Sequence, residues 1–182
     1  MKMKVFFEKN KKDLIWFIGV FSIMLVLRVF LFAPVTVSGE SMMPTLVDKE
    51  KIITSKISKL ERLDIVPFKA PNEPGKLYIK RIIGLPGESI EYKDDTLYIN
   101  NKAYKEPYLD EYKELVSGSL TEDFSLNSLY NVPVVPKDSY FVMGDNRQNS
   151  TDSRMIGFIK KEDIIGSSKL VIWPINKIGF FD

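Results

Sequence analysis

Three short segments hold the side chains that could do chemistry in this chain of 182 residues. Ser41 lies in the Gly/Ser turn 38–46, Lys80 lies in segment 77–88, and segment 143–154 is a run of carboxylates, amides and arginines. The chain has no histidine and no cysteine. This excludes Ser-His-Asp triads, cysteine nucleophiles, His/Cys zinc sites and cysteine-held iron–sulfur clusters. The remaining nucleophiles are Ser, Thr and carboxylates, and the candidate bases are Asp, Glu, Tyr, the amino terminus and a lysine whose pKa is lowered by burial.

The turn around Ser41 matches no general serine-nucleophile motif. Met43 stands where a G-x-S-x-G elbow needs its second glycine, and no S-x-x-K occurs in the chain. Taken alone, a serine here is more typical of an ordinary turn or cap than of a nucleophile. Its position is more informative, because eight residues separate it from Ala33, the end of a long apolar run. An extended chain covers about 3.3 Å per residue, so Ser41 should lie within roughly 26 Å of a membrane that this run crosses.

Lys80 lies in a segment that reads as a strand. Because side chains alternate between the faces of a strand, Lys80 and Arg81 must point in opposite directions. If the face of Lys80 is buried, desolvation lowers its pKa toward the range of a general base. The alternative is a lysine on an edge strand, where its charge opposes aggregation.

Segment 143–154, taken alone, is typical of a solvated loop with its own Asx turns. Its carboxylates and amides could also bind calcium. The segment lacks the spacing and the terminal glutamate of an EF-hand loop. We therefore expect no metal at this loop.

An apolar run, residues 14–33, is expected to anchor the chain in a membrane. It carries a single charge, Arg28, and as a helix it would span roughly 30 Å, the thickness of the hydrocarbon core. The alternatives are a cleaved signal peptide or a buried core helix, but no small-x-small cleavage site follows the run. Residues 1–13 hold five lysines against two acidic residues, and no Lys or Arg occurs between Arg28 and Lys49. This bias predicts a single-pass protein of the plasma membrane with a cytoplasmic tail, 1–13.

Residues 34–182 are expected to form one extracytoplasmic domain. Its near-neutral charge offers no basic face for nucleic acid. Residues 160–165 are the one helical candidate, and 107–129 read as loop with room for a short helix. Short strands are predicted at 35–37, 51–54, 64–68, 77–85, 89–92 paired with 96–100 across Asp94-Asp95, 140–143 and 168–173. The prediction is a mainly β fold, a small antiparallel barrel-like catalytic domain behind one N-terminal transmembrane helix.

The segments SGESMMPTL, YIKRIIGLPGE and GDNRQNSTDSR, with the weaker ERLDIVPF at 61–68, resemble four ordered boxes of the type I signal peptidases. Those enzymes are membrane-bound serine proteases that use a Ser-Lys dyad. The short interval between Glu88 and Tyr140 resembles the compact Gram-positive form. The resemblance implies that Ser41 is the nucleophile, that Lys80 is the general base, and that Ser150 orients the lysine amine.

The resemblance also implies supporting roles for other residues of the boxes. Asp145, Arg147, Asp152 and Arg154 would brace the site, with Asp152 and Arg154 as a pair. The residues implied to shape the substrate site are Gly39, Met42, Pro44, Tyr78 and Ile82. Three positions depart from the family pattern: Gly39 replaces a serine that in some members joins the oxyanion hole, and Leu63 and Pro67 replace usual residues of the second box. The second oxyanion donor is left open.

The expected function is removal of signal peptides from secreted preproteins after small-x-small sites, without metal or cofactor. The partners would be preprotein signal peptides and membrane lipid, with no nucleic acid, and the oligomeric state is left open. One alternative is a peptidase for a single client such as a pilin precursor, or one that cleaves itself, although no Ala-Gly or Ala-x-Ala site occurs. Others are a non-catalytic membrane-tethered assembly factor, and a tethered β module that binds carbohydrate or ions.

Overall fold

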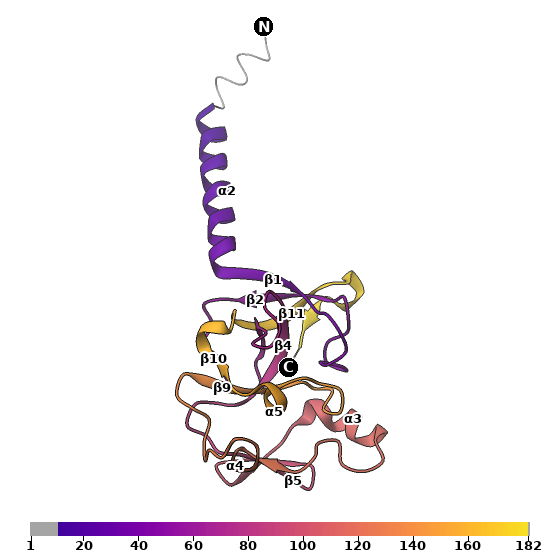
Figure 1. Ribbon diagram of the computed structural model, residues 1–182. Coiled ribbons are helices and arrows are strands. Elements are labelled where there is room, and N and C mark those ends of the chain that lie inside the picture. Colours follow the sequence, from indigo (N-terminus) through magenta and orange to yellow (C-terminus); the bar gives the residue numbers. More distant parts are fainter. Residues whose placement is uncertain (1–10, 182) are drawn as a thin grey trace.

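A computed structural model describes residues 11–181 as a long helix joined to a β-rich body (Figure 1). Helix α2 spans Lys11–Leu31, and strand β1, Phe32–Thr36, follows it directly. The helix therefore ends two residues before the predicted boundary at Ala33. Pro34 explains the difference, because a proline pushes the residue before it out of the helical region. Most of the predicted tail, residues 1–13, lies outside the described residues.

Among residues 11–181, one helix is long and apolar enough to cross a membrane. None of its apolar part, Asp13–Leu31, is buried within the described structure. The side chains of Trp16, Phe17 and Phe21 are all more than half exposed. This exposure is the opposite of what a core helix shows, so the alternative of a buried core helix is wrong.

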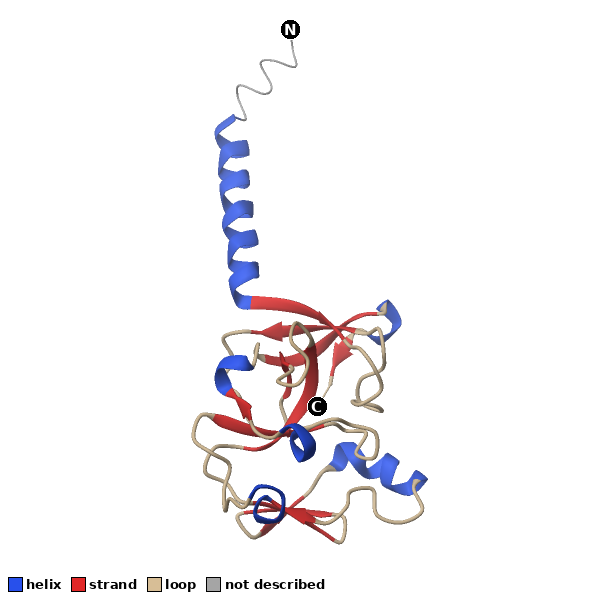
Figure 2. Cartoon of the chain, in the orientation of Figure 1, coloured by secondary structure: helices blue, strands red, loops and turns tan. Residues whose placement is uncertain are grey.

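The body is built on an eight-stranded antiparallel sheet. Seven of its strands form one continuous series, and the eighth, β12, pairs only with β11. Along that series the order is β1-β2-β11-β3-β4-β9-β10. The bounds are β2 Lys51–Ser55, β3 Ile65–Lys69, β4 Leu77–Gly84, β9 Ser139–Met143, β10 Ile159–Lys160, β11 Ser167–Trp173 and β12 Gly179–Phe180. Figure 2 shows these strands gathered at the foot of the helix.

A second antiparallel sheet of four strands lies at the end of the body away from the helix (Figure 1). Its order is β7-β6-β5-β8, with bounds β5 Ile90–Lys93, β6 Thr96–Ile99, β7 Lys102–Tyr104 and β8 Phe124–Ser125. The predicted pairing of β5 with β6 across Asp94-Asp95 is confirmed. Both aspartates have positive φ, 48° and 58°, as a type I′ hairpin turn requires.

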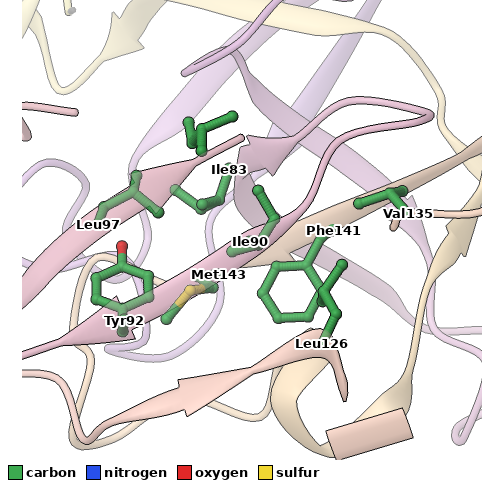
Figure 3. Close-up of a cluster of buried hydrophobic side chains, with 9 residues drawn as sticks. Ile83, Ile90, Tyr92, Leu97, Leu126, Val135, Phe141 and Met143 are labelled. Atoms are coloured by element: carbon green, nitrogen blue, oxygen red, sulfur yellow. The ribbon is translucent and has the colours of Figure 1, made fainter. Parts of the chain in front are cut away.

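The two sheets share a hydrophobic core (Figure 3). Ile83 of β4 and Phe141 and Met143 of β9 come from the large sheet, while Tyr92 of β5 and Leu97 of β6 come from the small one. This packing fixes the small sheet against the inner strands β4 and β9. The mainly β, antiparallel fold class is thereby confirmed.

The helical predictions fared less well than the strands. Residues 160–165 form the end of β10 and a single 3₁₀ turn, Lys161–Asp163, so the helix predicted there is wrong. Segment 107–129 contains a 3₁₀ turn Pro107–Leu109 and two short helices, α3 Asp110–Leu115 and α4 Leu126–Tyr130. Helix α5, Ser153–Ile156, was not predicted. Helices of four to six residues are too short to show a helical period.

Candidate active site

Ser41 and Lys80 meet where the turn after β1 crosses β4. The Lys80 ammonium donates a hydrogen bond to the Ser41 hydroxyl oxygen, with 2.5 Å between Nζ and Oγ. The turn is closed by backbone hydrogen bonds from Met43 to Glu40 and from Leu46 to Met42. A hydroxyl and an amine at this separation have the geometry that a nucleophile and its general base require.

Lys80 lies on an inner strand, since β4 pairs with β3 on one side and β9 on the other. The interpretation of Lys80 as an edge-strand lysine is therefore wrong. The predicted divergence of its neighbour is confirmed, because Arg81 reaches Asp145 while Lys80 reaches Ser41. Both side chains are buried, Lys80 at 4% exposure and Arg81 at 0%, because both faces of β4 are covered here.

Burial sets the protonation of Lys80. Desolvation lowers its pKa from the ordinary 10.5 to about 8. The charges of Asp152 and Asp145 act in the opposite direction and raise it, and the charge of Arg154 lowers it. A neutral amine is therefore available to Ser41 near physiological pH.

The main chain of Ser41 is held by the loop that follows β9. The Asn146 N–H donates to the Ser41 carbonyl oxygen at 3.0 Å, and the Asn146 side chain donates to the Glu40 carbonyl at 3.2 Å. Gly144 lies so close behind the turn that a Cβ there would come within 2.5 Å of the Ser41 carbonyl oxygen and 2.2 Å of the Ser150 hydroxyl. Only glycine fits at position 144 without movement of its neighbours.

Three of the four predicted bracing residues form ion pairs close to Ser41 and Lys80. Asp145 accepts from Arg81 through both carboxylate oxygens, at 2.9 and 2.8 Å, and from the Thr45 hydroxyl at 2.6 Å. The predicted Asp152–Arg154 pair is confirmed, with bonds of 2.9 and 2.8 Å. Burial alone would raise the pKa of Asp152, but the hydrogen bonds and charge of Arg154 outweigh it and lower that pKa. These carboxylates are committed to arginines, which argues against the calcium alternative.

Arg147, the fourth predicted bracing residue, forms an ion pair with Glu106, which was not predicted from the sequence. Its Nη2 donates to Glu106 Oε1 at 2.5 Å and to the Tyr108 hydroxyl at 3.0 Å. Its Nη1 donates to the Tyr92 hydroxyl at 2.6 Å, and its Nε to the Gly144 carbonyl at 3.1 Å. No local pattern marks Glu106 or Tyr108, because they follow β7 in a segment with weak periodicity. Asn146 and Thr45, also missed, lie inside the quoted boxes.

A cavity of about 250 Å³ opens beside the dyad between the end of β1 and the first half of β4. Its lining residues are Val37, Ser38, Gly39, Glu40, Ser41, Met42, Leu77, Tyr78, Ile79, Lys80, Asn149 and Thr151. Gly39, Met42 and Tyr78 were predicted to shape the substrate site and do line it. Pro44 and Ile82 do not, and Ile82 packs in the core beside Phe68 and Val142.

Ser150 lies close to the site without the contact expected of it. Its buried hydroxyl makes no hydrogen bond to Lys80 among residues 11–181, although it lies close enough to Asp152 to help lower the pKa of that carboxyl. The Ser150 hydroxyl faces the same side of Gly144 as the Ser41 carbonyl oxygen, because a Cβ on that glycine would meet both oxygens. The orienting role of Ser150 stays a prediction.

Comparison with known proteins places this geometry among peptidases. Residues 11–173 match the family model described as "Signal peptidase, peptidase S26". Signal peptidase I of Bacillus caldolyticus is 42% identical over 95% of this chain and 96% of its own length. Signal peptidase I T of Bacillus subtilis is 48% identical over 85% of this chain and 80% of its own length. The crystal structure of a signal peptidase I from Enterococcus faecalis, 45% identical, superposes with a TM-score of 0.59 over 61% of this chain and 97% of that one.

Proposed function

This chain belongs to the signal peptidase family, peptidase S26, and from that premise we propose that it removes signal peptides from preproteins with Ser41 as nucleophile and Lys80 as general base. The observation that carries the proposal is the 2.5 Å contact between Lys80 Nζ and Ser41 Oγ, buried and yet beside an open cavity. The lowered pKa of Lys80 supports the assignment. At pH 7 a pKa of about 8 leaves roughly a tenth of the lysines neutral, against roughly 0.03% at 10.5.

The proposed reaction has two halves that share the same base. In the first, neutral Lys80 takes the Ser41 proton, Oγ bonds to the carbonyl carbon, the peptide C–N bond breaks, and the lysine proton passes to the leaving amine. In the second, Lys80 takes a proton from water, the hydroxide attacks the ester, and Ser41 recovers its proton as the signal peptide leaves with a new carboxylate.

The Ser41 backbone N–H is the first candidate donor to the oxyanion in this mechanism. Gly39 has no hydroxyl to contribute, and its own N–H donates to Asp48 Oδ1 at 2.9 Å. The second donor therefore has to come from water or from another main-chain amide.

The cavity supports a preference for small residues before the cleaved bond. Met42, Tyr78 and Ile79 occupy much of the space beside Ser41, and the remaining 250 Å³ is shared among several subsites of an extended peptide. Bulky side chains would have to displace these residues, of which Met42 and Ile79 are also packed in the core. This shape supports the proposed cleavage after small-x-small sequences.

The apolar helix supports a position at the membrane surface. We assign residues 14–33 as the anchor, 1–13 as a cytoplasmic tail and 34–182 as the extracytoplasmic catalytic domain, with the lysines of the tail fixing the orientation. Lipid is then a constant neighbour of the enzyme. A preprotein that carries its own apolar segment shares the same membrane, which raises its effective concentration at the site.

The test is cleavage of a preprotein with an Ala-x-Ala site by the full-length protein in detergent. Wild type, Ser41→Ala and Lys80→Met are compared, and the new amino terminus is sequenced. We expect cleavage after the final alanine by wild type alone. Cleavage by either variant at the wild-type rate would overturn the dyad. If folded wild type does not cleave this preprotein, the proposal of a general signal peptidase is wrong. A peptidase for a single client, such as a pilin precursor, or a non-catalytic assembly role would then be favoured.

A further inference from the structure

Glu106 is a buried carboxylate that was not among the predicted site residues, and it accepts three hydrogen bonds close to that site. Glu106, only 5% exposed, follows β7 at the start of the segment that leads to α3. Its Oε1 accepts from the hydroxyl of Tyr92 at 2.7 Å, from the hydroxyl of Tyr108 at 2.6 Å and from Arg147 Nη2 at 2.5 Å. Among residues 11–181, it is the carboxylate that pairs with Arg147.

Tyr108 ties the same segment to the strand of the general base. Its ring lies 3.9 Å from the Arg81 guanidinium, a cation–π distance, and its hydroxyl accepts from Arg147. Arg81 is the chain neighbour of Lys80, and Arg147 is the neighbour of Asn146. Together, Glu106 and Tyr108 therefore contact β4, which carries Lys80, and the loop 144–147, which binds the main chain of Ser41.

The connection to Ser41 runs through the loop 144–147. Arg147 Nε holds the Gly144 carbonyl at 3.1 Å, and the Arg147 N–H donates to the Asp145 carbonyl at 2.9 Å. Within the turn so fixed, the Asn146 N–H points at the Ser41 carbonyl. Arg147 is 2% exposed, so without a carboxylate partner its charge would be buried uncompensated and the turn would have to rearrange.

We propose that Glu106 and Tyr108 are positioning residues for the reaction: they fix Arg147 and thereby hold the loop 144–147 against the main chain of Ser41. The inference rests on the proposed function, because it gives this loop a role in aligning the nucleophile. None of Glu106, Tyr108 and Arg147 lines the cavity beside the dyad. A loss of alignment should therefore lower kcat and leave KM unchanged, since small displacements of reacting groups cost rate rather than binding.

The experiment compares Glu106→Gln with a matched control in the full-length protein in detergent. Glutamine keeps the shape and removes the charge. Glu88→Gln breaks another Arg–carboxylate pair, Arg62 Nη2–Glu88 Oε1 at 2.5 Å, whose hydrogen bonds within the described part of the chain do not reach the loop 144–147. Preprotein cleavage gives kcat and KM, and hydrogen exchange followed by mass spectrometry reports on a peptide that contains Asn146.

For Glu106→Gln we expect kcat to fall about 10- to 100-fold with KM within about twofold, and Asn146 to exchange at least about tenfold faster. For Glu88→Gln we expect wild-type kcat and wild-type exchange at Asn146. Wild-type kcat and exchange in Glu106→Gln would overturn the inference. An equal loss of kcat in Glu88→Gln would also overturn the inference, because the effect could then be explained by general destabilisation of the protein.

A second variant keeps the inference testable if Glu106→Gln does not fold. Tyr108→Phe keeps the ring over Arg81 and loses only the hydroxyl, so we expect a fall in kcat of about 3- to 10-fold with the same rise in exchange. Unchanged values in that variant would overturn the inference. If wild type cleaves no preprotein, the proposed function fails separately, and the exchange at Asn146 alone decides this inference.

Discussion

The N–H of Asn146 donates to the carbonyl oxygen of Ser41 at 3.0 Å, while the Ser41 hydroxyl is held by Lys80 at 2.5 Å. Ser41, the proposed nucleophile, is thus fixed at its main chain and at its side chain by two segments that are remote from it and from each other in sequence. A serine held at both ends loses little freedom on reaching the reactive geometry.

The rate should depend on pH through Lys80. Because the amine must be neutral and its pKa is about 8, we expect kcat/KM to rise about tenfold per pH unit below that value and to level off above it. Initial rates on a peptide substrate between pH 5.5 and about 10 measure this. A flat profile, or a midpoint near the ordinary lysine value, would exclude Lys80 as the base.

Gly144→Ala should nearly abolish activity. The added Cβ would meet the Ser41 carbonyl oxygen at 2.5 Å, so the turn must shift, and we expect kcat to fall more than about 100-fold with a loss of stability of ~1–3 kcal/mol. Gly84→Ala is the control, because its Cβ would meet side-chain atoms of Ile90 and Val135 in the core, away from the dyad. Comparable stability loss with near-wild-type kcat in Gly84→Ala is expected, and an active Gly144→Ala enzyme would contradict the packing argument.

Asp145→Asn should unfold at a much lower urea concentration than wild type. The substitution removes the carboxylate from a fully buried pair with Arg81, and breaking such a pair costs ~3–5 kcal/mol. Glu162→Gln breaks the exposed pair with Lys160 and should leave the midpoint unchanged. Equal urea midpoints for the two variants would show that burial does not determine how much an ion pair contributes to the free energy of unfolding.

Asp152→Asn should change how stability depends on pH. The pKa of Asp152 is lowered in the fold, so its ionised form stabilises the protein above the unfolded value of about 3.9, and this contribution disappears as pH falls through the lower folded value. Melting temperatures from pH 7 to about 3 should therefore fall less steeply for the variant, which starts from a lower value at pH 7. Parallel curves would mean that Asp152 titrates alike in both states.

Local patterns predicted most strands of the large sheet and the β5–β6 hairpin, but not the short strands β7, β8, β10 and β12. The pairing of Ser41 with Lys80 was expected only from the family resemblance. The alternation of Lys80 and Arg81 and the Asp94-Asp95 turn are properties of adjacent residues, so the sequence carries them directly. Ile82 shows the limit of that reasoning. Ile82 lies on the same face of β4 as Lys80, but β4 runs from the cavity into the core. The alternation of side chains along a strand does not tell how far along it the cavity ends.

Glu106 and Tyr108 could not be predicted for a different reason. Their partners Arg81 and Arg147 are brought to them by the packing of the small sheet on β4 and β9, and no pattern near residue 106 encodes that contact. The short helices α4 and α5 depend on single caps, Ser125 and Asp152, which are hard to tell from loop residues before the chain is folded.

Helix α2 passes into β1 without a linker. This direct connection fixes the distance between the helix and the cavity beside Ser41. Leu31 ends the helix, every residue from Phe32 to Thr36 is paired with β2, and Lys56 donates to the carbonyls of both Val29 and Leu31. A bilayer that holds the helix therefore also sets the height and tilt of the cavity above the lipid (Figure 1). A polypeptide leaving the same bilayer reaches Ser41 only after a set length of chain. The enzyme would thus select its bond by counting from the membrane as well as by side-chain fit.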